Sequence, residues 1–238
     1  MPDRLGSAFD SPDTKSRYVR RLFSTIADRY DLITGLLSYG QDRRWKRRLV
    51  SLAPLRPGVR ALDLACGTGD ITYALSHAGA GSVGLDITPR MVEIARGKGQ
   101  SGSRPGFLVG DMMALPFGDA TFDVVTTGYG IRNVPVIAGA LAEIARVLRP
   151  GGVLLSLDFD RPSNPLLRAV YLGYLTLVGS TLGLALHGDP DTYRYIPESI
   201  RRYPGAEGVS AIARANGFAA CERFRVLGGL MALHRAVK

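Results

Sequence analysis

Residues 61–70, with the one-letter sequence ALDLACGTGD, constrain the fold more than any other stretch of the chain. An apolar run leads into a turn of small residues, and the helix-like segment 71–75 follows. This succession predicts a buried strand, a tight loop and a helix N-terminus, which is where open α/β sheets bind nucleotide-like cofactors. Residues 82–87 predict a second strand ending at Asp86, and an acid there typically binds ribose hydroxyls. We therefore expect a cofactor that contains a ribose.

The residues of the turn indicate which ribose-containing cofactor it binds. The dinucleotide fingerprint G-x-G-x-x-G requires glycine where this chain has Ala65, Gly67 and Asp70, so two of the three positions do not match. A carboxylate at the helix start would repel a pyrophosphate, whereas it suits a cofactor with ammonium and sulfonium groups. We therefore expect S-adenosylmethionine (SAM), with a merely structural glycine turn as the alternative.

Strands and helices are predicted to alternate along the chain. Strands are expected at 59–64, 82–86, 105–109, 122–127 and 153–158, with helices at 69–77, 89–96 and 136–148. This alternation predicts an α/β fold with a doubly wound, mostly parallel sheet. A helical stretch at 199–216, interrupted at Pro204, precedes two final strands at 218–226 and 230–237. These form a hairpin, so the last strand is expected to run antiparallel.

Five parts of the chain are expected on this basis. They are a flexible tail (1–15), an N-terminal helical cap (16–57), a SAM-binding core (58–160), a helical substrate cover (161–205) and a C-terminal helix and strand hairpin (206–238) that completes the sheet. The cap contains an amphipathic helix at 16–30, a mixed segment at 32–39 and a basic helix for which Asp42 is the expected N-cap.

The predicted cover contains no charged side chain from residue 169 to 186, which by length alone would match a membrane span. Glycines and hydroxyl side chains dilute its hydrophobicity, and Arg168 and His187 bracket it closely. We therefore expect a buried or interfacial helix that lines a pocket for an apolar substrate.

Composition and charge narrow the classes of partner. With 46% hydrophobic and 21% charged residues, the 238-residue chain is globular rather than disordered. A net charge of +9 favours anionic partners, either nucleic acid or the inner face of a membrane. The basic cluster at 43–48 is interpreted equally well as a phosphate-binding or a solvated face, and no RNA-recognition signature accompanies it, so we expect no nucleic-acid partner.

The expected location is cytoplasmic, because residues 1–12 are polar and lack the apolar segment of a signal peptide. The histidines His77, His187 and His234 are scattered without the spacing of metal ligands, so we expect no metal.

Several segments resemble the menaquinone and ubiquinone C-methyltransferase family. They are residues 27–31, 45–47, 62–70, 114–117, 130–134, 191–195 and 198–200, and the resemblance runs from about Tyr18 to the last residues. The Arg-Asn-Val loop at 132–134 and the Tyr-Arg-Tyr segment at 193–195 are more specific than the glycine turn, which related methyltransferases share.

The resemblance implies a class I SAM-dependent methyltransferase with a Rossmann-like, seven-stranded sheet. Its expected reaction is C-methylation of a prenylated quinol, most simply demethylmenaquinol. The alternatives are the ubiquinone precursor 2-methoxy-6-polyprenyl-1,4-benzoquinol or another small phenol. The net charge of +9 separately leads us to expect peripheral contact with an anionic membrane surface, and a homodimer is kept open.

Cofactor contacts are expected from the glycine turn and from the ends of the strands. The candidates are Asp63, Ala65, Gly67, Thr68, Gly69, Asp86, Ile87, Asp111, Met112 and Gly128. For Asp63 the motif does not separate contact with the cofactor's ammonium group from orientation of the glycine loop through backbone N–H groups. Gly128 stands where many family members place a serine, so its contact is expected to be absent or made by the backbone.

Three residues are expected to act in catalysis. Arg132 would stabilise the phenolate form of the quinol, Asn133 would hold a water that relays the proton, and Tyr30 would lie at the substrate mouth. Tyr30 is also expected to bind the quinol ring, together with Tyr193 and Tyr195 on an extended segment. The alternatives are ordinary turn chemistry for the Arg-Asn pair and packing for the tyrosines.

Overall fold

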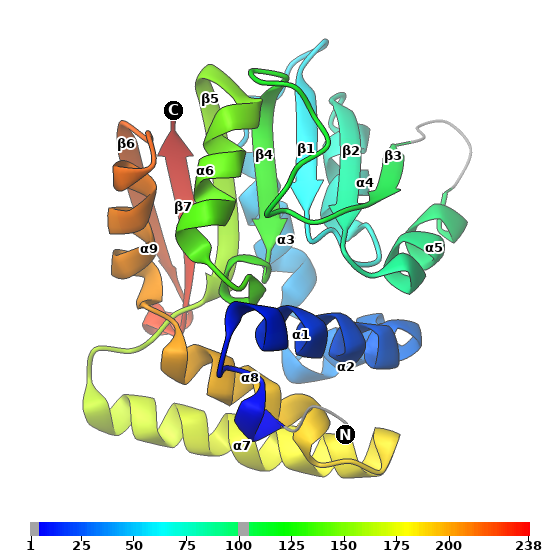
Figure 1. Ribbon diagram of the computed structural model, residues 1–238, viewed down its shortest axis with the longest axis vertical. Coiled ribbons are helices and arrows are strands. Elements are labelled where there is room, and N and C mark those ends of the chain that lie inside the picture. The colour runs from blue at the N-terminus through cyan, green and yellow to red at the C-terminus, as the bar shows by residue number, and fades with distance from the viewer. Residues whose placement is uncertain (1–4, 100–104) are drawn as a thin grey trace.

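The structure is a computed structural model that describes residues 5–99 and 105–238. Within these residues seven strands form one sheet in the order β3-β2-β1-β4-β5-β7-β6 (Figure 1). The strands are β1 (Arg60–Leu64), β2 (Gly81–Asp86), β3 (Gly106–Val109), β4 (Phe122–Gly128), β5 (Leu148–Phe159), β6 (Ala220–Val226) and β7 (Met231–Val237). Strands β1 to β5 pair in parallel, and β7 runs antiparallel to both β5 and β6. The predicted fold class is thus confirmed.

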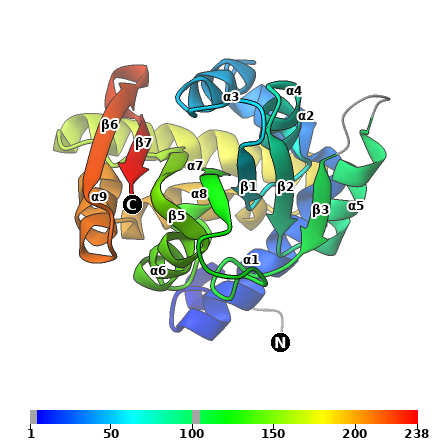
Figure 2. The same ribbon diagram turned by 90° about the horizontal axis from the view of Figure 1, so that it is seen from above.

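Helices cover both faces of the sheet (Figure 2). One face packs on α6 (Ile137–Val147) and α9 (Gly205–Ala215), and the other on α3 (Asp42–Ser51) and α4 (Asp70–His77). The side chains of β5 alternate between them, since Leu154 belongs to the first core and Leu155 to the second. Helix α5 (Pro89–Gly97) packs against Phe107 at the β3 edge. Burial on both faces explains why the strands read as continuous apolar runs.

Strand β5 begins five residues earlier than predicted, and includes the residues 149–152 that we assigned to a turn. The register with β4 shifts there, because Phe122 pairs with Leu148 while Val124 pairs with Val153. Gly151 adopts a φ of +76° inside this irregularity. The turn residues predicted at 149–152 are therefore present, but they form a bulge inside β5 instead of a loop before it.

The predicted tail is wrong for the part of it that the structure describes. Residues 5–7 form the short 3₁₀ helix η1, with Leu5 buried, and α1 runs from Pro12 to Ile26. Ser11 caps α1, since its Oγ accepts a hydrogen bond from the Thr14 backbone N–H (3.2 Å) and its own N–H donates to Thr14 Oγ1 (2.9 Å). This reciprocal pair, followed by Pro12 at the first helical turn, was the missed signal.

Two further predictions in the cap need correction. After the 3₁₀ segment η2 (Ala27–Arg29), the supposed mixed segment is mostly the helix α2 (Tyr30–Leu37). Asp42 does not cap α3: it lies in the first turn with its side chain buried, where Tyr129 Oη donates to it (2.8 Å). Its carboxylate belongs to the interior of the protein.

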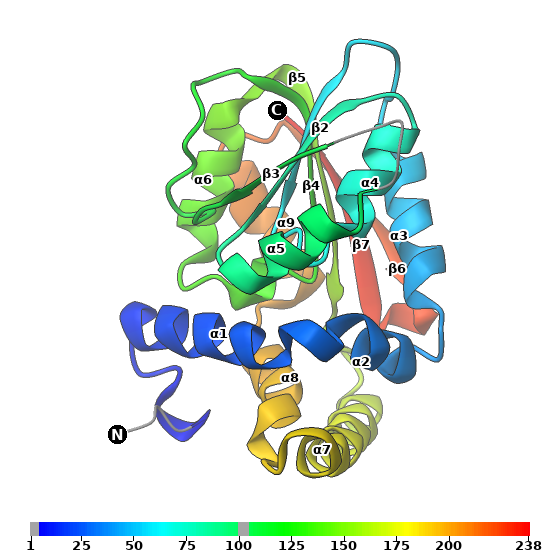
Figure 3. The same cartoon turned by 90° about the vertical axis from the view of Figure 1, so that its right-hand side faces the viewer.

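Helices α1, α2, α7 (Pro165–His187) and α8 (Asp191–Arg202) lie across the end of the sheet toward which the parallel strands point (Figures 1 and 3). Tyr193 and Tyr195 lie on α8 and not on an extended segment. Helix α7 is long and apolar enough to cross a membrane by length and composition. It packs along α8, where Gly179 and Gly183 permit close approach: a Cβ at Gly183 would lie 2.5 Å from the backbone oxygen of Asp189.

Candidate active site

A cavity of about 440 Å³ lies between the carboxyl ends of the strands and the helical cover. Twelve of the predicted site residues line it: Tyr30, Ala65, Gly67, Asp86, Ile87, Asp111, Met112, Gly128, Arg132, Asn133, Tyr193 and Tyr195. Asp63, Thr68 and Gly69 do not line this cavity. The carboxyl edge of a doubly wound sheet is where such folds bind ligands, so this cavity is the candidate active site.

Two positions of the glycine turn require glycine because neighbouring side chains pack closely against them. Gly69 has a φ of +90°, and a Cβ there would lie 3.0 Å from Phe107 Cζ and 3.2 Å from Ala95 Cβ. Gly67 has a φ of +54°, and a Cβ there would lie 3.6 Å from Tyr30 Cε1. The Tyr30 ring therefore covers the turn on its cavity side, whereas Gly69 serves the packing of β3 and α5.

Asp86 links the end of β2 to the turn. Its two carboxylate oxygens accept hydrogen bonds from the backbone N–H groups of Gly67 and Thr88, both at 2.8 Å. Burial raises the pKa of Asp86, while these two donors oppose that rise. Each carboxylate oxygen can accept a further bond. The side chain lines the cavity and can therefore receive two hydroxyl donors of a ribose.

Asp63 is fully buried beneath the turn. Thr72 Oγ1 donates to one of its oxygens (2.7 Å) and Thr126 Oγ1 to the other (2.8 Å), so the carboxylate ties α4 and β4 to β1. Burial raises the pKa of Asp63 to about 7, against the lowering effect of the two threonines. The structure thus gives Asp63 a positioning role that the sequence pattern did not distinguish from cofactor contact.

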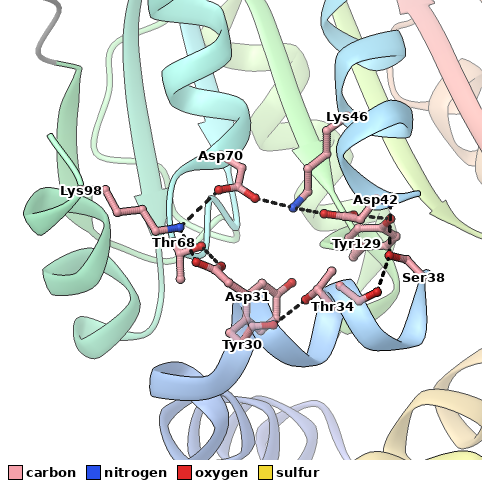
Figure 4. Close-up of polar contacts among 11 residues, drawn as sticks. Tyr30, Asp31, Thr34, Ser38, Asp42, Lys46, Thr68, Asp70, Lys98 and Tyr129 are labelled. Atoms are coloured by element: carbon pink, nitrogen blue, oxygen red, sulfur yellow. Dashed lines mark hydrogen bonds and ion pairs between the residues drawn. The ribbon is translucent and has the colours of Figure 1, made fainter. Parts of the chain in front are cut away.

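Asp70 does not present a free negative charge. Lys46 Nζ lies 3.0 Å and Lys98 Nζ 3.3 Å from its carboxylate (Figure 4). Although burial opposes its ionisation, the two lysines hold the pKa of Asp70 below its ordinary value. The step of our charge argument that used an uncompensated Asp70 is therefore wrong, because lysines from α3 and from the end of α5 neutralise it.

The same network fastens α2 to the glycine turn. Asp31 accepts a hydrogen bond from Thr68 Oγ1 (2.6 Å) and forms an ion pair with Lys98 (2.6 Å; Figure 4). Lys46 continues the network to Asp42 (2.6 Å). Thr68 thus holds α2, the lid over the glycine turn, in place through Asp31. Its side chain lines a second, much smaller pocket and not the main cavity.

Arg132, in the short helix η3 (Ile131–Asn133), forms a buried ion pair with Asp158 at the end of β5. Its Nη1 donates to Asp158 Oδ1 (2.6 Å) and to the Tyr129 carbonyl (3.0 Å). Burial opposes the guanidinium charge, but Asp158, together with Tyr195 and Tyr30, more than offsets this effect, and the pKa of Arg132 is raised. Asp158 was not among the predicted site residues; its place at the carboxyl end of a parallel strand was the available signal.

Two atoms of the Arg-Asn pair lack a partner within residues 5–99 and 105–238: the Arg132 Nε donor and the Asn133 Oδ1 acceptor. Both residues line the cavity, and Asn133 Nδ2 is held by the Tyr129 carbonyl (2.8 Å). Lys15 of α1 fixes the loop by donating to the carbonyls of Arg132 (2.9 Å) and Val134 (2.6 Å). A buried donor and a buried acceptor are therefore available to a ligand.

The three predicted tyrosines differ in their surroundings. Burial raises the pKa of Tyr30, of Tyr195 and, to about 12, of Tyr193, so all three are neutral donors near neutral pH. Tyr193 Oη shares a hydrogen bond with His187 Nε2 (2.9 Å), whereas Tyr195 Oη has no partner among the described residues. The Tyr195 ring stacks on Tyr18 and Phe9 of the N-terminal segment, at centroid distances of 5.5 and 5.7 Å.

The rest of the cavity wall is mainly apolar. The N-terminal helices, the end of β5, α7, α8 and the start of β7 contribute the apolar residues Leu22, Phe23, Ile33, Trp45, Phe159, Leu175, Ile196, Leu230 and Met231. No group of three or more His, Cys, Asp or Glu side chains in the described part of the chain is arranged to hold a metal ion. The cavity therefore combines a polar end at the strand termini with a large apolar end under the cover.

Comparison with known proteins agrees with this geometry. The model of the ubiE/COQ5 methyltransferase family matches residues 11–238. The demethylmenaquinone methyltransferase of Thermus thermophilus is 43% identical over 217 residues, which cover 90% of this chain and 98% of that protein. The ubiquinone/menaquinone biosynthesis C-methyltransferase UbiE of Ectopseudomonas mendocina is 41% identical over 237 residues, covering 96% and 92%.

Solved structures show the same fold. A SAM-dependent methyltransferase from Thermotoga maritima, described as a possible histamine N-methyltransferase, superposes with a TM-score of 0.67 at 21% identity, covering 92% of this chain and 99% of that one. The magnesium protoporphyrin IX methyltransferase of Synechocystis PCC 6803 with bound SAH gives 0.66 at 20% identity, covering 94% and 99%.

Proposed function

The chain belongs to the ubiE/COQ5 methyltransferase family, and from this premise we propose that its substrate is demethylmenaquinol. It is a SAM-dependent C-methyltransferase of menaquinone or ubiquinone biosynthesis. The Thermus relative is named for demethylmenaquinone alone and the Ectopseudomonas relative for both quinones, so menaquinone synthesis is common to the two names. The observation that carries the proposal is one cavity that joins Asp86 to Arg132 and to a large apolar wall.

The residues at the polar end fit SAM. Asp86 faces the cavity with free acceptor capacity for ribose hydroxyls, and Gly67 and Gly128 bring bare backbone to the cavity wall. Gly128 lacks the serine hydroxyl found in many family members, and a Cβ there would lie 2.7 Å from Ile71 Cδ1. When bound, SAM supplies an electrophilic methyl group on a sulfonium.

The residues beyond this end act on the quinol. The ring carbon becomes nucleophilic as the neighbouring hydroxyl loses its proton. The new C–C bond would form as the methyl–sulfur bond breaks with its electron pair kept by sulfur, and the hydrogen on that ring carbon would leave as a proton. Arg132 Nε donates to the ring oxygen and stabilises its negative charge, while Asn133 Oδ1 accepts from a water that carries the proton away. Asp158 holds the guanidinium in place, and Tyr30, Tyr193 and Tyr195 enclose the ring.

A paired substrate assay tests the choice of quinol. Purified enzyme, labelled SAM and either demethylmenaquinol or 2-methoxy-6-polyprenyl-1,4-benzoquinol of equal tail length are compared by kcat/KM. We expect the naphthoquinol to be preferred, and a strain lacking the gene to accumulate a menaquinone one methyl lighter by mass spectrometry. Preference for the benzoquinol, or for a phenol without a tail, would overturn the proposal and support the corresponding alternative.

The role of Arg132 is tested by separating turnover from cofactor binding. Arg132→Ala is expected to lower kcat by about 100-fold, the effect of losing a donor to a developing oxyanion, while calorimetry shows unchanged SAM affinity. Asp86→Ala is the matched variant that weakens SAM binding. Because Arg132→Ala leaves Asp158 buried without its partner, Arg132→Lys, which keeps the charge, is measured beside it. Equal loss of turnover and SAM affinity in both Arg132 variants would show a structural role.

A further inference from the structure

The outer face of α7 is an exposed apolar surface. Leu166, Val170, Leu177 and Leu184 are 72%, 63%, 70% and 61% exposed. They recur along the helix at spacings of four and seven residues, so they share one face. The opposite face packs on α8 through Gly179 and Gly183, and Tyr171 and Leu175 line the cavity. Helix α7 therefore packs on the rest of the protein along one face and exposes the other along its length.

A second apolar group continues this surface around the mouth of the cavity. Leu32 (57% exposed) and Leu36 (50%) lie on α2, and Tyr39 (76%) lies just after it. Tyr39 and Tyr174 of α7 both line the cavity and are both exposed, and their hydroxyl groups share a hydrogen bond. Leu227, in the turn between β6 and β7, also lines the cavity and is 52% exposed. The apolar end of the cavity thus opens within this surface.

Basic side chains flank the same side of the molecule. Helix α2 lies between α3 and α7 (Figure 3), and α3 exposes Arg43, Arg44, Arg47 and Arg48. Within the part of the chain that the structure describes, the side chains of these four arginines form no ion pair and no hydrogen bond. Exposed leucines beside unpaired arginines are typical of proteins that bind the surface of an anionic bilayer.

We propose that α7, the exposed side chains of α2 and the arginines of α3 form a docking surface for an anionic lipid bilayer. The mouth between Tyr39 and Tyr174 then faces the lipid, so a substrate with an apolar tail enters and leaves without crossing water. A second copy of the chain is the less suitable occupant, because it would bring two sets of unpaired arginines together on a protein of net charge +9. The substrate tail in this inference rests on the proposed function, whereas the docking surface itself rests on exposure and charge.

Vesicle flotation without any quinol tests the docking surface. The full chain is expected to bind phosphatidylglycerol-containing vesicles, to bind pure phosphatidylcholine at least ~10-fold more weakly and to be released by salt. Leu177→Glu with Leu184→Glu is expected to weaken binding by at least ~10-fold, since each places a charge in the lipid-facing stripe. Val109→Glu, at a 50% exposed apolar position on the β3 edge, is the matched control and should bind as the unaltered chain does. Arg43→Gln and Arg47→Gln should each lower binding to anionic vesicles about fivefold.

Light scattering and an activity assay separate the possible results. If the unaltered chain is a dimer that Leu177→Glu dissociates, and no variant binds vesicles, α7 is a subunit interface and the inference is wrong. Equal binding by the α7 variant and the Val109 control would also overturn it. Methylation of a short-tailed quinol in solution is expected to persist in the α7 variant. Retained methylation without vesicle binding rejects only the docking surface, whereas vesicle binding without methylation rejects only the proposed function.

Discussion

Three aspartates near the cavity, Asp63, Asp70 and Asp86, differ in role because their surroundings differ. Asp86 faces the cavity, Asp63 is sealed beneath it between two threonines, and Asp70 is neutralised by two lysines. The residue type is the same in each case, and desolvation and nearby charges decide the chemistry. The raised pKa of Asp63 can be tested through protein stability, because its side chain is 0% exposed.

Asp63 is expected to make stability depend on pH between about 4 and 7. Burial raises its pKa in the folded chain to about 7, well above the value of ~4 in the unfolded chain. The folded chain then binds a proton that the unfolded chain has released, so stability falls as pH rises through this window and stays low above it. Asp63→Asn has no such proton.

The measurement is urea unfolding of both proteins at about pH 4.5 and pH 7.5. Relative to Asp63→Asn, the unaltered chain should lose about 3 kcal/mol of unfolding free energy across this window. Parallel pH profiles would show that the buried carboxylate is ionised at both pH values.

The two helical elements over the sheet are attached in different ways. Helix α2 is held to the glycine turn by polar contacts of Asp31, whereas α7 is held to α8 by the close approach that its glycines permit. Exposed ion pairs contribute little to stability, and tight apolar packing contributes more. Loss of the Asp31 contacts is therefore expected to cost little stability, because Ile33 and Leu37 also place α2 in an apolar cluster with Tyr193. The packing of α7 on α8, in contrast, makes α7 a fixed wall of the cavity.

Asp31→Ala is expected to loosen the lid without unfolding the protein. The loss of its contacts with Thr68 and Lys98 should raise the dissociation rate of SAM up to about fivefold, with little change in thermal stability. Stopped-flow displacement measures this rate. Asp28→Ala is the control, since Asp28 pairs with Arg90 of α5 (2.7 Å) without touching the turn. Equal rates in the two variants would argue against a lid.

Two glycines of α7 should respond oppositely to alanine. A Cβ at Gly183 would lie 2.5 Å from the Asp189 oxygen, so Gly183→Ala is expected to destabilise the fold by about 1–3 kcal/mol. A Cβ at Gly173 meets nothing within 4 Å, so Gly173→Ala should stabilise by up to about 1 kcal/mol through helix propensity. Chemical denaturation compares the two variants. The same sign for both would contradict the packing of α7 on α8.

The whole molecule encloses its cavity with segments far apart in the sequence. The N-terminal helices, the ends of β1, β2 and β4, the η3 loop and α7–α8 each contribute lining residues. A ligand in this cavity therefore touches both the sheet and the helices that cover its carboxyl end, and its binding to the folded state stabilises that state.

Hydrogen exchange can check this enclosure. Adding SAH, the demethylated cofactor, is expected to slow exchange in the glycine turn and also in α2 and η3, because these segments close over the polar end. A short-tailed quinol should extend protection to α8. Protection limited to the turn after both additions would show that the cover does not close on its ligands.

Local sequence signals predicted the strands of the sheet, their order along the chain and the helices between the strands. The strand, turn and helix at 61–77, the alternation that yields a parallel sheet, and the interruption at Pro204 are local signals of spacing and turn chemistry, and the structure confirms each of them. The family resemblance was confirmed as well, because the ubiE/COQ5 family model matches residues 11–238.

The partners of the charged side chains were visible in the three-dimensional structure and not in the sequence. The pairing of Arg132 with Asp158 and the neutralisation of Asp70 by Lys46 and Lys98 join residues 24 to 28 positions apart on different elements. Tyr193 and Tyr195 lie on a helix, where Tyr195 packs in one cluster with Leu5 and Tyr193 packs with Ile26 and Ile33. These contacts join distant parts of the chain, so no local pattern predicted them. Local patterns report the conformation of the backbone, whereas the ionisation of a side chain depends on whichever neighbours the fold brings to it.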